Sequence, residues 1–79
     1  MKENRNMFTV IELQTTNGTT SAQAFHFDNE NQAYQKYHEI LMYAAVSTVE
    51  IHAATVLNEY GNVLKNEFYA HEQEPNTGA

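Results

Sequence analysis

The chain of 79 residues has no cysteine and no tryptophan, and only one proline and three glycines. Without cysteine it can form no disulfide bond, no thiolate metal site and no thiol nucleophile. Disulfide bonds belong to oxidising compartments, so their absence agrees with a reducing cell interior. The sequence excludes every class of protein whose chemistry depends on a thiol, and we expect a cytoplasmic protein.

Basic residues are also scarce. Lys and Arg number 4 against 10 Asp and Glu, which gives a formal net charge of -6 and a pI near 4.9. Proteins that bind nucleic acids neutralise phosphates with Lys and Arg, and this composition offers few of either. We therefore expect no nucleic-acid partner, and a charged partner should be basic.

Long apolar runs are missing as well. A membrane-spanning helix needs about 20 consecutive apolar residues, and the N-terminal segment lacks the pattern of a secretory signal. We expect a soluble protein without a membrane partner. Because residues 1–6 and 72–79 are polar and without apolar periodicity, we predict flexible tails around a single domain of residues 7–71.

The domain is predicted to begin with a β-hairpin. Residues 7–14 are rich in β-branched and aromatic side chains, as is typical of a strand. The dipeptide Asn17-Gly18 follows, and this pair favours the tight type I′ turn between antiparallel strands. Residues 21–27 form the returning strand.

A helix is predicted to begin near Glu30. Asn29 is a favoured N-cap residue, and Gln32 stands three residues later, as in a capping box. The residues that recur with helical spacing on one face, and are therefore expected to pack, are Ala33, Tyr37, Ile40, Leu41 and Ala44.

Residues 49–57 and 63–71 are predicted as two further strands, joined by a turn at residues 58–62. The order strand, strand, helix, strand, strand indicates an α+β fold of the ββαββ type. We expect a four-stranded, mostly antiparallel sheet with one helix packed on a face. The order of the strands within the sheet is left open.

The register of the second hairpin follows from hydrophobic alternation. Placing Asn58 opposite Val63 gathers the apolar side chains on one face. A three-residue loop, with Asn58 opposite Asn62, would put charged side chains among them. The pattern therefore favours the even-numbered loop.

Both faces of the first hairpin are substantially apolar. One face carries Met7, Thr9, Ile11, Leu13, Ala22, Ala24 and His26, and the other carries Phe8, Val10, Glu12, Gln23, Phe25 and Phe27. One helix covers only one face of a sheet, so the other face needs a cover from outside the subunit. We expect a homo-oligomer, with a dimer favoured, or else a partner protein. The residues we assign to this interface are Phe8, Val10, Phe25 and Phe27.

A polar cluster is predicted on the second hairpin. In the favoured register His52 lies across from Tyr69, and Glu50 lies across from His71. We predict that these residues, together with His38 of the helix, bind a small ligand or border an interface. The full set is His38, Glu50, His52, Tyr69 and His71.

The sequence predicts neither a metal site nor catalysis. His26, His38, His52 and His71 lack the short spacings that metal ligands on one helix or strand use. No nucleophile elbow, glycine-rich phosphate loop or metalloprotease helix is present, and a helix on so small a sheet leaves little room for a cleft. We therefore expect no cofactor, no metal and no catalytic residue, and a protein that is not an enzyme.

Four segments together resemble a family of small proteins encoded by phages and prophages of Gram-positive bacteria. The segments are residues 33–41 (AYQKYHEIL), 44–47 (AAVS), 49–52 (VEIH) and 56–61 (VLNEYG), within a likeness that extends from Phe8 to His71. The family has no established activity. The resemblance implies a phage-encoded accessory protein in the cytoplasm of the bacterial host, or one associated with the virion.

Two functions from different classes follow. The first is a non-enzymatic accessory protein that acts through protein–protein interaction, as a homo-oligomer or on a phage or host protein. The second is a protein that sequesters a small, nucleotide-like ligand in a pocket between subunits, near the predicted polar cluster.

Overall fold

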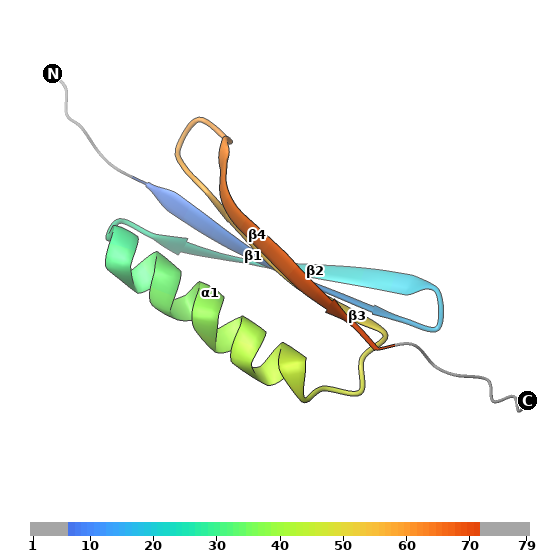
Figure 1. Ribbon diagram of the computed structural model, residues 1–79. Helices are drawn as coiled ribbons and strands as arrows, with labels where there is room; N and C mark the ends of the chain where they lie inside the picture. The colour runs from blue at the N-terminus through green and yellow to red at the C-terminus, as the bar shows by residue number, and fades with distance from the viewer. Residues whose placement is uncertain (1–6, 72–79) are drawn as a thin grey trace, which may run out of the picture.

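The computed structural model describes residues 7–71, and the two predicted tails lie outside the described residues. The elements follow one another as predicted (Figure 1): β1 (Phe8–Thr16), β2 (Thr19–Phe27), α1 (Glu30–Ala45), β3 (Ile51–Leu57) and β4 (Val63–Ala70). The expected α+β fold of the ββαββ type is confirmed, with all strands in one sheet and a single helix packed on it.

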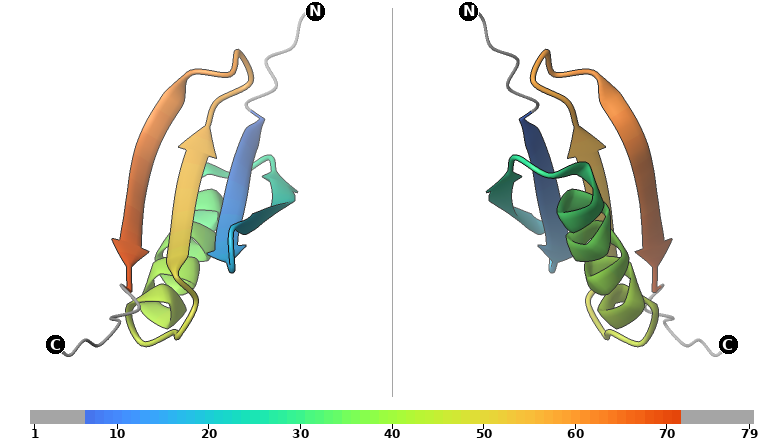
Figure 2. Two further views of the ribbon diagram at one scale, coloured as in Figure 1. Left: turned by 90° about the vertical axis from the view of Figure 1, so that its right-hand side faces the viewer. Right: turned by 90° about the vertical axis from the view of Figure 1, so that its left-hand side faces the viewer.

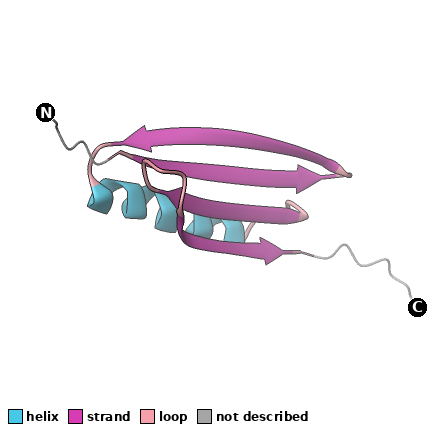
Figure 3. Ribbon diagram, turned by 90° about the horizontal axis from the view of Figure 1, so that it is seen from above, coloured by secondary structure: helices cyan, strands magenta, loops and turns pink. Residues whose placement is uncertain are grey.

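The strand order, which the sequence left open, is β2-β1-β3-β4, and each neighbouring pair is antiparallel. The central strands β1 and β3 come from different hairpins, so their pairing joins the two halves of the chain. Figure 2 shows that α1 runs along one face behind these central strands, with β2 and β4 at the two edges. One face of the sheet is therefore covered and the other is open (Figure 3).

The first hairpin has the predicted tight turn. Thr16 lies opposite Thr19, and the two residues between them, Asn17 and Gly18, have φ values of 54° and 78°. A type I′ turn requires positive φ at both central positions, which glycine adopts without strain and asparagine adopts more readily than other residues. The tip of this hairpin projects past the end of α1 (Figure 3).

The turn of the second hairpin differs from the prediction. The Asn58 N–H donates to the Asn62 carbonyl oxygen at 3.0 Å, and the Asn58 side chain accepts from the backbone N–H groups of Tyr60 and Asn62. This is the three-residue loop that the hydrophobic pattern argued against. Gly61, with φ of 81°, supplies the left-handed residue that such a loop uses.

A register shift next to this turn resolves the conflict. Val56 lies opposite Lys65, but its neighbour Leu57 lies opposite Val63, so β4 contains one extra residue there. Beyond the shift, the pairing is the one that hydrophobic alternation predicts, as in Ile51 opposite Ala70. The bulge lets a tight loop and the correct faces coexist.

The helix begins as predicted, because Asn29 caps it. The Asn29 side-chain oxygen accepts a hydrogen bond from the Gln32 N–H at 3.0 Å. The five residues predicted to pack are the buried residues of α1: Ala33, Tyr37, Ile40, Leu41 and Ala44.

The core lies between α1 and the sheet. It combines the buried helix residues with Val10, Ala54 and Val56 from the two central strands. Phe8, Phe25 and Phe27 are partly buried and pack against it.

These contacts correct the predicted interface. Val10 has no exposed surface, and Phe8, Phe25 and Phe27 belong to the covered side of the sheet. We predicted a partner interface at Phe8, Val10, Phe25 and Phe27. For Val10 this is wrong, because the residue is fully buried, and the other three lie under the helix and not on the open face. Three phenylalanine rings bury more apolar area under a helix than the smaller side chains of the opposite face would, which explains why the helix covers this face.

Candidate functional site

The open face of the sheet is the first candidate site. Its central strands contribute Ile11, Leu13, Ile51 and Leu57, each half-buried or exposed, and the edge strand β4 contributes Phe68, which is 61% exposed. Ala53 fits between Leu13 and Phe68, its partners on the neighbouring strands, and is buried by them. We call this surface the open face, and its other strand residues are Thr9, Thr15, Thr20, Ala22, Ala24, His26, Thr55, Val63, Asn66 and Ala70.

The open face carries no Asp, Glu, Lys or Arg among the strand residues that the structure describes. The charged strand residues Glu12, Lys65 and Glu67 all lie on the side of the helix. The polar side chains of the open face pair with one another, as Thr9 does with His26, Thr15 with Thr20 and Thr55 with Asn66. In a chain with a net charge of -6, a largely apolar surface without Asp, Glu, Lys or Arg is a place where another such surface can pack with little repulsion.

The shape of the open face suits sheet-on-sheet packing. Small alanine side chains alternate with Leu13, Ile51 and Phe68, so the surface has both projections and gaps. Four strands spaced by about 4.8 Å, each with about eight residues rising by about 3.3 Å, present roughly 500 Å². Two such faces together bury roughly 1,000 Å², which is the size at which specific protein interfaces begin.

The second candidate site is the polar cluster, and its centre is His52. Its Nε2 atom lies 2.7 Å from Oε2 of Glu12, while the Gln14 side chain donates to the same oxygen at 3.1 Å. A carboxylate oxygen only accepts, which places the proton of the short bond on Nε2. His52 is 5% exposed, and its Nδ1 atom is buried without a partner.

Tyr69 and His71 lie beside the pair formed by Glu12 and His52. Tyr69 belongs to β4, and His71 directly follows that strand. Tyr69 is opposite His52 as predicted, and the His71 N–H donates to the Glu50 carbonyl oxygen at 2.7 Å, which confirms the predicted position of Glu50 across from His71. The rings of Tyr69 and His71 stack with 6.3 Å between centroids. Nε2 of His71 contacts the Ala44 carbonyl oxygen at 2.7 Å, and the same oxygen accepts from the Ser47 N–H at 3.2 Å, so His71 adds a second partner at the end of α1.

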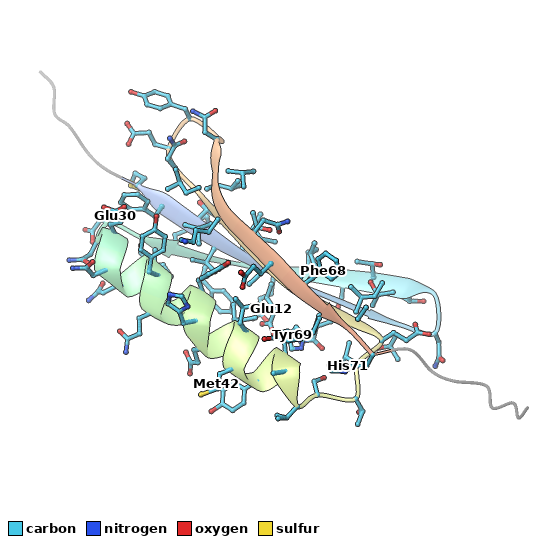
Figure 4. All side chains as sticks on the ribbon, in the orientation of Figure 1. Glu12, Glu30, Met42, Phe68, Tyr69 and His71 are labelled. Atoms are coloured by element: carbon cyan, nitrogen blue, oxygen red, sulfur yellow. The ribbon has the colours of Figure 1, made fainter. Side chains whose placement is uncertain are left out.

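His38 does not join the cluster. It is exposed on α1 and contacts the neighbouring Tyr37 ring edge-on at 5.1 Å between centroids. The cluster that forms contains Glu12 and Gln14 in its place. Figure 4 shows Glu12 and Tyr69 on the side of the sheet that faces α1, whereas Phe68 points away from it.

His52 and His71 line neither of two hollows in the described part of the chain. A hollow of about 480 Å³ is lined by Met7, His26, Phe27, Asp28 and Gln32, and none of these belongs to the cluster. Another of about 400 Å³ contains Tyr69, with Asn66, Glu67 and Phe68. Nε2 of His52 contacts Glu12 and Nε2 of His71 contacts the Ala44 carbonyl oxygen, so both atoms are engaged by other protein groups.

The Glu12 and His52 pair makes a prediction about stability. Replacing Glu12 by leucine leaves both ring nitrogens of His52 buried without partners, which should cost about 1–3 kcal/mol. The double variant Glu12→Leu, His52→Leu removes the polar groups altogether and should recover this loss. Urea unfolding measures both, and a double variant no more stable than Glu12→Leu would contradict this account of the pair.

Two tyrosines of α1 have raised pKa values. Burial is the main cause that raises the pKa of Tyr37, and the negative charge of Glu67 and the neighbouring Tyr34 add to it. Burial also raises the pKa of Tyr34, with Glu30 contributing through its charge and a hydrogen bond. The fold thus favours the neutral phenol at both positions, as expected for packing residues.

This shift predicts a loss of stability in alkali. Above the ordinary pKa of 10.0, the unfolded chain has lost the Tyr37 proton while the folded chain keeps it, so unfolding releases a proton and stability falls as pH rises. Well below that pH both states keep the proton, so this group adds nothing to the change of stability with pH. In urea unfolding at a series of pH values, Tyr37→Phe should lose less stability above pH 10 than the parent chain, and an equal loss would contradict the prediction.

The fold and the two sites define a class: a small α+β protein whose single helix leaves an apolar sheet face open. Among residues 7–71, no group of three or more His, Asp or Glu side chains is placed to hold a metal ion. Within the same part of the chain, no helix has the length and apolar character needed to cross a bilayer. Comparison of the chain with models of known families, with curated proteins and with solved structures found no match.

Proposed function

We propose that this protein is a non-enzymatic accessory protein that acts through protein–protein contact, and that the open face is where two copies of the chain meet. The observation that carries the proposal is the open face itself, with Phe68 61% exposed and Ile51 43% exposed. Leaving this apolar area in water costs free energy that a partner recovers by covering it.

A second copy fits the open face better than a charged partner does. The acidic strand residues Glu12 and Glu67 lie on the opposite side of the sheet, so the strands of two faces can approach without placing these like charges opposite one another. Symmetric dimers are the commonest soluble oligomers, and a two-fold axis brings the same patch of both copies together. Sheets packed in this way lie about 10 Å apart with their side chains interleaved.

The biological setting that we propose rests on the resemblance to proteins of phages and prophages. The assembled protein would work in phage assembly or bind a host protein, inside the bacterial host or on the virion. The acidic surface that remains outside the contact suits a basic partner protein better than a nucleic acid.

Mass in solution tests the self-association. Light scattering or sedimentation over a range of concentrations should give twice the chain mass of 9.0 kDa or a higher multiple. A mass of one chain at the highest concentration would contradict the proposal.

The alternative, sequestration of a small nucleotide-like ligand between subunits, has less support. Two of its predicted residues are engaged within the fold, since His52 contacts Glu12 and His71 contacts Ala44, and His38 lies apart from the others. We expect no heat when the protein is titrated with a panel of nucleotides in a calorimeter. Saturable heat from one of them, lost in a Tyr69→Ala variant, would instead favour the ligand function.

A further inference from the structure

The two edges of the sheet differ in how they are protected against further strand pairing. The edge strand β4 carries Lys65 and Glu67 and contains the bulge next to the turn, and both charge and irregularity discourage pairing with another strand. The edge strand β2 has nine residues, no charge, no proline and no irregularity along its pairing with β1. Only β2 presents a regular, unprotected edge.

The turn geometry fixes which backbone groups of β2 are free. In the tight turn, Thr16 and Thr19 form the hydrogen-bonded pair that closes the hairpin. Hydrogen-bonded and non-bonded pairs alternate along an antiparallel ladder. Thr19 and every second residue after it therefore point their N–H and C=O groups toward β1, and the residues between them point these groups away from β1. The residues whose backbone groups point outward are Thr20, Ala22, Ala24 and His26.

These four residues are arranged symmetrically about Gln23. If a second β2 runs antiparallel along the edge with Gln23 opposite Gln23 of the partner subunit, Ala22 lies opposite Ala24 and Thr20 lies opposite His26. Every outward pair then exchanges two backbone hydrogen bonds, and none is left over. Asp28, the first charged residue beyond the strand, falls beside the turn at Gly18 and far from its own copy.

We infer that β2 is a strand-pairing site for β2 of a second copy, joining two sheets into one continuous eight-stranded sheet about a two-fold axis at Gln23. This contact does not rest on the open face, because it uses the backbone edge and leaves the face free. Both helices lie on the same side of the joined sheet, and the two open faces become one surface. Edge pairing and face packing together assemble four copies.

Gln23 allows a test that leaves the open face unchanged, because its side chain is exposed and lies on the side of the helix. Gln23→Lys places two lysines opposite one another at the axis, and Gln23→Glu places two glutamates there. Each variant alone should lower the order of assembly by half. Mixing the two should restore it, with one copy of each variant across the edge. Association of both variants at the parent level, with no preference in the mixture, would overturn the inference.

Amide hydrogen exchange gives a second readout on the unmodified protein. In the associated state the amides of Ala22 and Ala24 should exchange at least about tenfold more slowly than those of Phe68 and Ala70, which point outward from the β4 edge. Ala24→Pro removes one outward N–H and should abolish the edge contact, whereas Ala70→Pro on the other edge should preserve it. Equal, fast exchange at both edges in the associated protein would contradict the pairing.

The readouts separate this inference from the proposed function. Phe68→Lys should disrupt face packing and leave pairs joined at β2, with the amides of Ala22 and Ala24 still protected. Gln23→Lys should leave pairs joined by the open face. If Phe68→Lys does not change the association, the open face is not a contact and the proposed function fails. If Gln23→Lys does not change it, the β2 edge is not a contact and this inference fails.

Discussion

Replacing Phe68 by lysine is expected to halve the mass of the assembled protein without unfolding the subunit. Phe68 is 61% exposed, so the substitution removes little packing from the isolated subunit. In the face-packed pair, however, two lysines would be buried without partners. Burying unpaired charge costs several kcal/mol, and about 3 kcal/mol already weakens association about a hundredfold.

Tyr60→Lys provides the matched control. Tyr60 is an exposed aromatic residue like Phe68, but it lies in the turn between β3 and β4 and not on the open face. The same change from aromatic to lysine there should leave the mass unchanged. If Phe68→Lys associates as tightly as Tyr60→Lys, Phe68 does not lie in the contact between copies.

Replacing Tyr37 by alanine is expected to bring the subunit close to complete unfolding. Tyr37 is the largest of the fully buried side chains and contacts the strands from the middle of α1. Removing a buried aromatic ring costs about 3–5 kcal/mol. A chain of this size is stable by only about 4–12 kcal/mol, so the variant should unfold at a much lower urea concentration.

The control for this substitution is Tyr43→Ala, six residues further along the same helix. Tyr43 is 58% exposed, so losing its ring should change stability by about 0.5 kcal/mol or less. Both substitutions introduce alanine into a helix, so the difference between them reports burial alone. Equal urea midpoints for the two variants would show that Tyr37 does not hold α1 against the sheet.

The elements of the fold could be predicted because their signals are local. Asn17-Gly18 specifies a turn through its own backbone preferences, and Asn29 caps the helix through a bond to a residue three positions away. The packing face of α1 follows from the spacing of its apolar residues. Each of these features depends on residues that are close in sequence, so no knowledge of the tertiary structure is needed.

The face covered by the helix could not be read from alternation, because both faces of the first hairpin are apolar. The size of Phe8, Phe25 and Phe27 was the available signal, since a helix gains more by covering them. The turn of the second hairpin was mispredicted for a related reason. Alternation reports the faces of the strands correctly, but a single bulge next to Leu57 reconciles those faces with a different loop.

The composition of the polar cluster depended on the strand order. Glu12 approaches His52 only because β1 and β3 are neighbours, and the sequence left this pairing open. A glutamate as the one charged residue of β1 was the signal, since a partly buried carboxylate requires a donor. His38 was grouped with the cluster on its residue type, but its position on α1 points it to solvent.

The most direct test of the central claim is to detect contacts between copies in a mixture of isotope-labelled and unlabelled protein. Nuclear Overhauser effects filtered for contacts between different copies should join the methyl groups of Ile11, Leu13 and Ile51 to those of the other copy or to its Phe68 ring. The result that would contradict the account is an associated protein in which none of these open-face side chains contacts another copy.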